Sequence, residues 1–323
     1  MFPAGGWGND MLFHIVVNPA GASGKTGKIW TWLEPVFRES GQEYRVHFST
    51  RERGIGEICR TLELQVRGTE DAAIVVVGGD GSVNEAINGF EHPGSVLFGH
   101  IPAGSGNDLT RDMGLPRDLL QLTARILEGR VHRTCDIGEL TYMDTHRSRR
   151  FAVSCGIGFD AGVCEMASRS RHKSVLNRLG LGKMIYLHAA FRIIGGQHCG
   201  KACITLEEGE VRREVHYDRI LLLACMNHQY EGGGFRFTPD ADADDGILNL
   251  CAADPKKNRA FYQAFPLVPL GRHLDLPYIH ELRGNRIEIQ TSEPMWVHTD
   301  GEVERQADHL RIRIMEEKLR LLI

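Results

Sequence analysis

Two glycine-rich turns that follow predicted strands each carry an aspartate. They are Gly78–Glu85 (GGDGSVNE) and Pro102–Leu109 (PAGSGNDL). Glycines let backbone N–H groups approach phosphate oxygens, and a helix that follows adds the positive end of its dipole. An aspartate there would repel bare phosphate, but it can act through a divalent cation or through water bound to that cation. Asp-Gly is also ordinary turn chemistry, yet two such turns at the ends of adjacent strands favour phosphate binding through Asp80 and Asp108.

An earlier turn, Asn18–Thr26, resembles a Walker A loop only at its end. Gly24-Lys25-Thr26 fits that motif, but Pro19 stands where its first glycine is required and has no N–H to offer a phosphate. The two later turns contain GxG without completing GxGxxG, because Asn84 and Leu109 occupy the last position. The sequence therefore disfavours both a P-loop and a dinucleotide-dehydrogenase fingerprint.

Acidic residues with two other spacings lie in the second half of the chain. Pro239–Leu248 contains four aspartates within six residues, which repel one another unless a hard cation holds them. A solvated acidic turn is the alternative. Asp300-Gly301-Glu302 follows the predicted strand Met295–Thr299. Glu302 could accept a proton from a substrate hydroxyl if its carboxylate lay near the γ-phosphate of a bound nucleotide. The alternative interpretation of these three residues is a plain hairpin turn.

Strand and helix signals along the chain predict an α/β fold in two domains, 11–130 and 131–323. In the first part strands and helices alternate, which implies parallel crossovers and a three-layer domain. The expected strands there are Leu12–Asn18, Tyr44–Phe48, Ala72–Val77 and Val96–Ile101, and the helices are Lys25–Ser40 with a bend at Pro35, Ile55–Arg67 and Asn84–Phe90.

After Val131 the predicted strands come closer together and are mostly antiparallel, so that we expect a β-rich domain. One helical insertion is expected at about Gly162–Ile194, and the last strand or two could return to the first domain. The expected strands are Cys135–Tyr142, Phe151–Cys155, Ala202–Glu207, Glu210–Tyr217, Ile220–Met226, Ile247–Ala252, Arg286–Gln290, Met295–Thr299 and Leu310–Ile314.

Composition excludes several classes of protein. With 38 Lys and Arg against 42 Asp and Glu, the net charge of −4 gives no general attraction to nucleic acid. The eight cysteines form no CxxC pair, so reduced thiols are expected. The start lacks the features of a signal peptide, and no stretch approaches the ~20 apolar residues of a membrane span. We expect a cytoplasmic protein, peripheral at the membrane surface if its substrate is a lipid.

Three motifs in this order resemble the signatures of the diacylglycerol kinase catalytic domain, closest to the soluble bacterial lipid kinases: Asn18-Pro19, Gly78–Glu85 and Gly104–Leu109. The resemblance runs from about residue 11 over nearly the whole chain. It implies an N-terminal three-layer α/β nucleotide-binding domain and a C-terminal β-rich, sandwich-like domain, with ATP and the active site in the cleft between them. It also implies Mg²⁺-dependent transfer of the ATP γ-phosphate to a lipid hydroxyl, with diacylglycerol the leading substrate and phosphatidic acid the product.

The resemblance assigns roles to particular residues. Glu302 would be the general base, and a water-linked network would join Asp80, Asp108, Asp136 and Asp245. Magnesium would bind the side chains of Asp242 and Asp245 and the carbonyl of Ile247. Thr50 could equally be a strand-end cap. The residues that would contact the nucleotide are Asn18, Thr50, Gly79, Asp80, Gly81, Ser82, Val83, Asn84 and Ser105.

Other functions and partners stay open at this point. An NAD kinase shares GGDG but would show a Gly-Phe-Leu type of third motif, and a phosphofructokinase-like sugar kinase typically lacks DGE. A non-catalytic lipid-binding protein of the same fold is the alternative outside enzymes. Between Arg169 and Arg192 six basic and no acidic residues accompany an apolar stripe, which could contact an anionic membrane or simply form a packed helix. An exposed sheet edge could support a homodimer.

Overall fold

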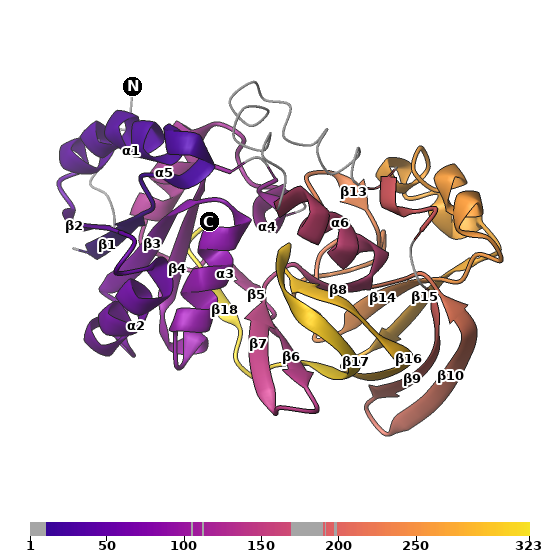
Figure 1. Ribbon diagram of the computed structural model, residues 1–323. Helices are drawn as coiled ribbons and strands as arrows, with labels where there is room; N and C mark the ends of the chain where they lie inside the picture. The colour runs from indigo at the N-terminus through magenta and orange to yellow at the C-terminus, as the bar shows by residue number, and fades with distance from the viewer. Residues whose placement is uncertain (1–10, 105, 112, 169–189, 191, 197–198) are drawn as a thin grey trace. The chain divides into compact units, whose positions relative to one another are not determined.

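The computed structural model divides the chain into two compact units (Figure 1). Unit 1 contains the residues up to Cys135 together with Glu317–Ile323, and unit 2 contains Asp136–Glu316. The structure describes residues 11–104, 106–111, 113–168, 190, 192–196 and 199–323. Among the helices in these ranges, none is long and apolar enough to cross a membrane.

Unit 1 is built on a six-stranded sheet with the order β2-β1-β3-β4-β18-β5. Its first four strands are parallel, β18 runs parallel to β4, and β5 is antiparallel to β18. The strands are β1 Leu12–Val17, β2 Glu43–Phe48, β3 Ala72–Gly78, β4 Leu97–Pro102, β5 Arg133–Cys135 and β18 Leu319–Leu321.

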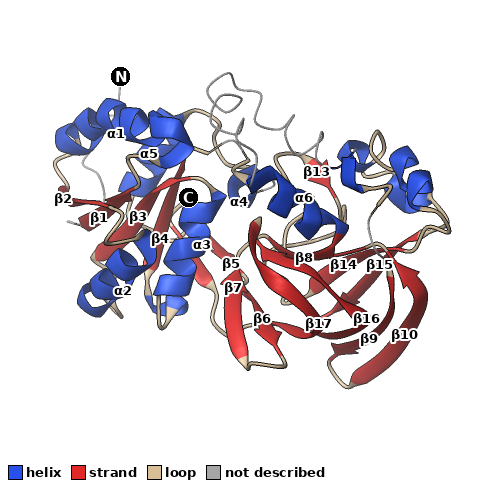
Figure 2. Cartoon of the chain, viewed as in Figure 1, coloured by secondary structure: helices blue, strands red, loops and turns tan. Residues whose placement is uncertain are grey.

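Helices cover both faces of this sheet, as Figure 2 shows: α1 (Gly21–Glu39) and α5 (Leu119–Leu127) on one face, α2 (Ile55–Val66) and α3 (Asp80–Gly89) on the other. All seven residues of β3 are buried, which is why this strand is a continuous β-branched run rather than an alternating one. The expected three-layer α/β unit is confirmed.

Two helices of unit 1 differ from the prediction at their starts. α3 begins at Asp80, directly after Gly79, and not at Asn84 as expected. Asp, Gly and Ser favour helix starts, and an aspartate in the first turn complements the helix dipole. Within α1, non-helical backbone angles occur at Ala22, Ser23 and Gly24, so the irregularity lies near its start, while Pro35 lies inside the helix.

Unit 2 contains a ten-stranded sheet, and its paired strands are antiparallel. The order is β15-β14-β11-β8-β16-β17-β6-β7, with β9 on β16 and β10 on β9. The strands are β6 Gly138–Tyr142, β7 Arg147–Phe151, β8 Ser154–Gly158, β9 Gly200–Glu208, β10 Val211–Ile220, β11 Leu222–Met226, β14 Leu248–Ala253, β15 Ile279–Gly284, β16 Arg286–Thr299 and β17 Glu302–Ile314, and a separate hairpin joins β12 Tyr230–Glu231 to β13 Phe235–Arg236.

The two strands expected at Arg286–Gln290 and Met295–Thr299 are one strand, β16, with irregular register between Gln290 and Met295. Such irregularities bend and twist a strand, which lets one long hairpin serve two regions of a sheet. The helical insertion is described as α6, Phe159–Ser168, which packs on β8, β11 and β16. Most of the segment expected to continue this helix lies outside the described residues.

A buried carboxylate in unit 1 ties α2 to the chain between α3 and β4. Glu63 is 1% exposed, and its two carboxylate oxygens accept the N–H groups of Glu91 and His92, each at 2.6 Å. A few residues on, Glu317 accepts the N–H of Gly94 at 2.9 Å and holds the C-terminal segment to the same turn. Carboxylates thus fix the path of the chain into β4.

Replacing Glu63 by alanine should lower the free energy of unfolding by about 2 kcal/mol, because two N–H groups lose a charged acceptor. Glu57→Ala on the same helix is the matched control, since the Glu57 side chain is 62% exposed, and it should unfold like the wild type. Urea unfolding measures both variants. Equal stability of the two would contradict this role of Glu63.

Candidate functional site

The glycine-rich turns of unit 1 follow the carboxyl ends of three adjacent parallel strands. Asn18 follows β1, Gly79 follows β3 and Ala103 follows β4. In an open parallel sheet this edge is where ligands bind. The strand order therefore places the three turns along one edge of the sheet.

The second and third turns contact each other through their backbones. A Cβ on Gly104 would lie 2.7 Å from the Cα of Gly79, and a Cβ on Gly79 would lie 3.0 Å from the Cα of Gly104. A Cβ on Gly78 would lie 2.3 Å from the Oγ of Ser82. Side chains are excluded at these positions, so glycine is required for the two turns to pack backbone against backbone.

Asp80 holds the third turn in place with both of its carboxylate oxygens. Its Oδ2 accepts the N–H of Asn107 and its Oδ1 accepts the N–H of Asp108, each at 2.8 Å. A Cβ on Gly106 would lie 2.7 Å from Asp80 Oδ2, so the close approach again depends on glycine. The aspartate of GGDG therefore organises the GSGND turn directly, in addition to any role toward a cation.

The third turn is further braced by its own side chains. Asn107 has a positive φ of 54°, and its side chain accepts the N–H of Gly104 at 2.9 Å and donates to the carbonyl of Gly104 at 3.0 Å. Asp108 is 6% exposed and lies 3.2 Å from the Nε of Arg111, which also donates from Nη2 to the carbonyl of Gly106. Ser105, predicted to contact the nucleotide, lies outside the described residues.

The other residues that were predicted to contact the nucleotide lie at the start of α3, in the first turn and, for Thr50, in the turn after β2. Gly81, Ser82, Val83 and Asn84 lie in the first turns of α3, where Val83 and Asn84 are buried. The carbonyl of Asn18 accepts the N–H of Gly21 at 3.0 Å and closes the first turn.

Thr50 has a local partner. Its Oγ1 accepts the N–H groups of Glu52 and Arg53, each at 3.2 Å, and its own N–H donates to the carbonyl of Arg53. This is the geometry of a hydroxyl-capped turn after β2. The hydroxyl of Thr50 therefore caps this turn and not the following helix, because α2 begins at Ile55 with Gly54 as its N-cap and has no side-chain cap hydrogen bond.

In unit 2, Asp136 anchors the acidic loop. Its N–H donates to the carbonyl of Ala243 at 2.7 Å, and its Oδ2 accepts the N–H of Gly246 at 2.6 Å. Its carbonyl in turn accepts a hydrogen bond from the side chain of the buried Asn227 at 2.8 Å. A residue that the sequence assigned to a catalytic network thus fixes the loop that was predicted to bind magnesium.

The acidic loop concentrates negative charge around Asp245. Desolvation raises the pKa of Asp245, and the neighbouring carboxylates of Asp242 and Asp136 act in the same direction, against a hydrogen bond from the Ile247 N–H and the positive charge of Arg283. Arg283 lies 3.2 Å from Asp245 Oδ2. Several carboxylate oxygens on one loop form a type of ligand set that suits a hard divalent cation such as Mg²⁺.

The DGE turn joins β16 to β17 and is fixed by its aspartate. Asp300 and Gly301 both have positive φ, 49° and 82°. The carboxylate of Asp300 accepts three backbone N–H groups between β7 and β8, those of Ala152, Val153 and Ser154, at 2.8–3.0 Å. Asp300 therefore holds the DGE turn against residues 152–154. Glu302 begins β17 and is the exposed carboxylate of the motif.

A buried group beside this turn was missed by the sequence reasoning. The Nε2 of His298 on β16 lies 3.2 Å from Asp160 Oδ2 of α6 and 3.4 Å from Glu231 Oε1 of β12, and Glu231 also accepts the hydroxyl of Ser154 at 2.7 Å. A Cβ on Gly156 would lie 1.9 Å from Asp160 Oδ2. No local spacing could have indicated the group, because its members are far apart in the chain.

His298 is subject to two opposing demands. Burial by itself lowers its pKa, but the carboxylates of Glu231, Asp160 and Asp300 outweigh burial and raise the pKa to about 9. At the same time the N–H of Gly301 donates to His298 Nδ1 at 3.1 Å, which requires that this nitrogen carry no proton. The carboxylates favour the charged ring, whereas the DGE turn favours the neutral ring with its proton on Nε2.

The His298 group should make stability depend on pH. Because the pKa of His298 is raised from 6.5 to about 9, its contribution is fully present below about pH 6.5 and is lost as the pH rises through about 9. The difference in free energy of unfolding between wild type and His298→Asn should therefore shrink by up to about 3 kcal/mol over that range. Urea unfolding at several pH values tests this, with His309→Asn as the control; a constant difference for His298→Asn would contradict it.

Comparison with known proteins covers both units. Residues 13–140 match the diacylglycerol kinase catalytic domain, and residues 153–323, more than half of the chain, match the YegS C-terminal NAD kinase beta sandwich-like domain. A diacylglycerol kinase of Bacillus subtilis (strain 168) is 24% identical over 291 residues, which cover 90% of this chain and 89% of the relative. A diacylglycerol kinase of Mycobacterium tuberculosis (strain H37Rv) is 28% identical over 236 residues, which cover 73% of this chain and 71% of the relative.

A solved structure supports the fold. A crystal structure of a diacylglycerol kinase from Bacillus anthracis str. Sterne superposes with a TM-score of 0.65 at 19% identity, covering 95% of this chain and 94% of that chain. Matches to both domain families, in the expected order, account for nearly the whole sequence. The chain is a kinase and belongs to the diacylglycerol kinase catalytic-domain family of bacterial lipid kinases.

Proposed function

We propose that this kinase transfers the γ-phosphate of ATP to the hydroxyl of a membrane lipid in the presence of Mg²⁺, and that diacylglycerol is its leading substrate. Phosphate binding is supported mainly by the two hydrogen bonds that the N–H groups of Asn107 and Asp108 donate to the carboxylate of Asp80, because they join the two glycine turns. The lipid part rests on relatives named as diacylglycerol kinases.

The turns of unit 1 supply what phosphate binding needs. Gly79 and Gly104 pack backbone against backbone, so the main chains of both turns lie at one edge of the sheet. The N-terminal end of α3 adds a positive dipole end directly after Gly79. Phosphoryl transfer depends mainly on such positioning and on charge neutralisation.

Glu302 is proposed as the general base. Its carboxylate would accept the proton of the lipid hydroxyl as the hydroxyl oxygen bonds to the γ-phosphorus and the bond to the bridging β–γ oxygen breaks, leaving ADP. Asp300 and His298 do not touch the substrate in this account. They hold the turn from which Glu302 projects, through the hydrogen bonds of Asp300 to the 152–154 segment and of Gly301 to His298.

Magnesium is proposed to bind the acidic loop of unit 2 through the side chains of Asp242 and Asp245 and the carbonyl of Ile247. When bound, it would neutralise the charge that the carboxylates gather there, and Asp136 would hold the loop in shape through Gly246. The proposed reaction draws on residues of both units, since Asp80 and Asp108 belong to unit 1 and Glu302 to unit 2.

A lipid substrate requires contact with a lipid surface, so we propose peripheral membrane association of a cytoplasmic enzyme. The basic and apolar segment between Arg169 and Arg192 remains the predicted contact, and most of it lies outside the described residues. A homodimer formed through a sheet edge likewise remains a prediction.

Replacing Glu302 by glutamine should lower kcat for lipid phosphorylation by about 10²–10⁴-fold, the usual contribution of a general base, while the KM for ATP stays near the wild-type value. Transfer of label from [γ-³²P]ATP to diacylglycerol in mixed micelles measures this. Glu304→Gln, two residues further along β17, is the matched control and should retain activity, because Glu304 pairs with Arg149. Wild-type kcat in Glu302→Gln would remove Glu302 from the reaction.

Replacing Asp245 by alanine should lower activity at least about tenfold and shift the magnesium activation curve to higher concentration, because the loop loses an anionic ligand. Its KM for ATP should change little, and proteolysis between Pro239 and Leu248 should become faster. Asp244→Ala in the same loop is the control. An Asp245→Ala enzyme with unchanged activity and magnesium dependence would show that the loop holds no functional ion.

A further inference from the structure

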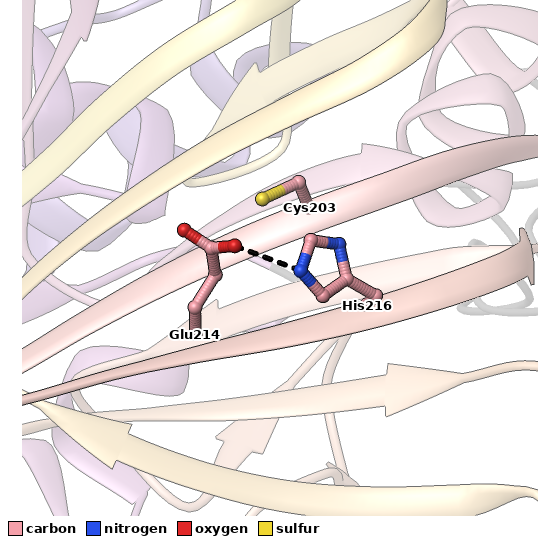
Figure 3. A group of neighbouring side chains, drawn as sticks. All are labelled: Cys203, Glu214 and His216. Atoms are coloured by element: carbon pink, nitrogen blue, oxygen red, sulfur yellow. Dashed lines mark ion pairs between the residues drawn. The ribbon is translucent and has the colours of Figure 1, made fainter.

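The edge hairpin of unit 2 brings together three side chains that are common ligands of transition metals. Cys203 lies on β9 and is the direct cross-strand partner of His216 on β10. Glu214 precedes His216 by two residues, so both side chains lie on the same face of β10. Figure 3 shows the sulfur, the carboxylate and the imidazole of these residues next to one another on two adjacent strands.

The distances fit binding to one ion. The Nε2 of His216 lies 2.7 Å from Glu214 Oε1, and the three ligand atoms all lie within 4.8 Å of one another. In a tetrahedral zinc site with Zn–S of about 2.3 Å and Zn–N of about 2.1 Å, the ligand atoms are about 3.6 Å apart. Small rotations of exposed side chains on a paired hairpin suffice to close the remaining difference.

The surroundings leave the site open to an ion from solution. The side chains of His216 and Glu214 are 70% and 53% exposed, and an adjoining cavity of about 660 Å³ is lined in part by Cys203, His216 and His309. A bound cation would displace the thiol proton of Cys203 and pair with the carboxylate of Glu214.

The histidine tautomer separates this group from the group around His298, the other described set of three such residues with neighbouring ligand atoms. There Nε2 of His298 faces the carboxylates of Asp160 and Glu231 and carries a proton in the charged ring and also in the neutral ring, because the N–H of Gly301 points at Nδ1. A protonated nitrogen cannot bind a metal. The His216 ring is mostly exposed, so on metal binding it can keep a proton on Nδ1 toward water and give up the proton through which Nε2 contacts Glu214.

We propose that Cys203, Glu214 and His216 form a binding site for a borderline-soft divalent metal ion, with Zn²⁺ as the preferred ion and water completing its coordination. Mixed sulfur, nitrogen and oxygen ligands suit Zn²⁺ better than Mg²⁺, which prefers oxygen alone. Because β10 pairs with β9 at the edge of the sheet, a bound ion would also link this edge strand to its neighbour. The site is separate from the acidic loop and does not depend on the proposed lipid substrate.

Cobalt binding to the chelator-treated full-length protein tests the site, because Co²⁺ takes the place of Zn²⁺ and reports thiolate ligation by a near-ultraviolet charge-transfer band. The wild type should bind one equivalent with this band, and Zn²⁺ should displace it. Cys203→Ser and His216→Asn should each weaken binding by more than about 100-fold, beyond the effect of losing a supporting residue alone. Cys164→Ser on α6 is the matched control and should bind like the wild type.

A second measurement does not depend on any variant folding correctly. Zn²⁺ should protect one thiol of the wild type from an aromatic disulfide reagent. Absence of both the thiolate band and thiol protection in the wild type would overturn the proposal. So would cobalt binding of wild-type affinity and spectrum in Cys203→Ser.

Discussion

The arrangement of the proposed phosphate-binding edge depends on the contact between the Asp80 carboxylate and the third turn. Both oxygens of Asp80 are engaged by backbone N–H groups, those of Asn107 and Asp108. Because Gly79 and Gly104 leave no room for a Cβ between the turns, the two backbones pack closely and the carboxylate of Asp80 reaches the amides of the third turn. Hydrogen bonds to a charged acceptor are about twice as strong as neutral ones, so this contact and the backbone packing of Gly79 against Gly104 together set the relative position of the two turns.

Carboxylates accept backbone N–H groups of loops at other positions as well. Glu63 accepts two N–H groups before β4, and Asp300 accepts three N–H groups between β7 and β8. Asp136 holds the acidic loop through Gly246. In each case a carboxylate supplies acceptors for loop amides that no sheet partner satisfies. The aspartates of the family motifs therefore stabilise loop conformations, in addition to the chemical roles proposed for them.

The elements of the fold differed in how well they could be predicted from the sequence. The buried parallel strands were predictable because runs such as Ala72–Val77 are continuous and β-branched. The start of α3 was placed too late because Asp80-Gly81-Ser82 reads equally as a loop and as a first helical turn. β7 was missed because Arg147–Arg150 carries no apolar alternation, and the pairing of β7 with β6 decides its structure.

At the candidate site, the motifs indicated which residues matter but not which partners they have. The spacing of the motifs does not show that Asp300 accepts hydrogen bonds from residues 152–154. Nor does it show that His298 lies close to Asp160 and Glu231. These contacts depend on the strand order of unit 2, which brings β8 next to β16. Glycine positions were the best signal, since Gly78, Gly79, Gly104 and Gly156 each lie where a Cβ would collide with a site atom or a neighbouring turn.

The most direct test of the central claim is to identify the acceptor of the γ-phosphate. Wild-type protein would be incubated with [γ-³²P]ATP and Mg²⁺ in mixed micelles that contain diacylglycerol, a sphingoid base and phosphatidylglycerol, with NAD and a hexose phosphate in the same solution. We expect label to appear in a lipid, with phosphatidic acid as the main product. Label on NAD or on the sugar, or no transfer to any lipid, would contradict it.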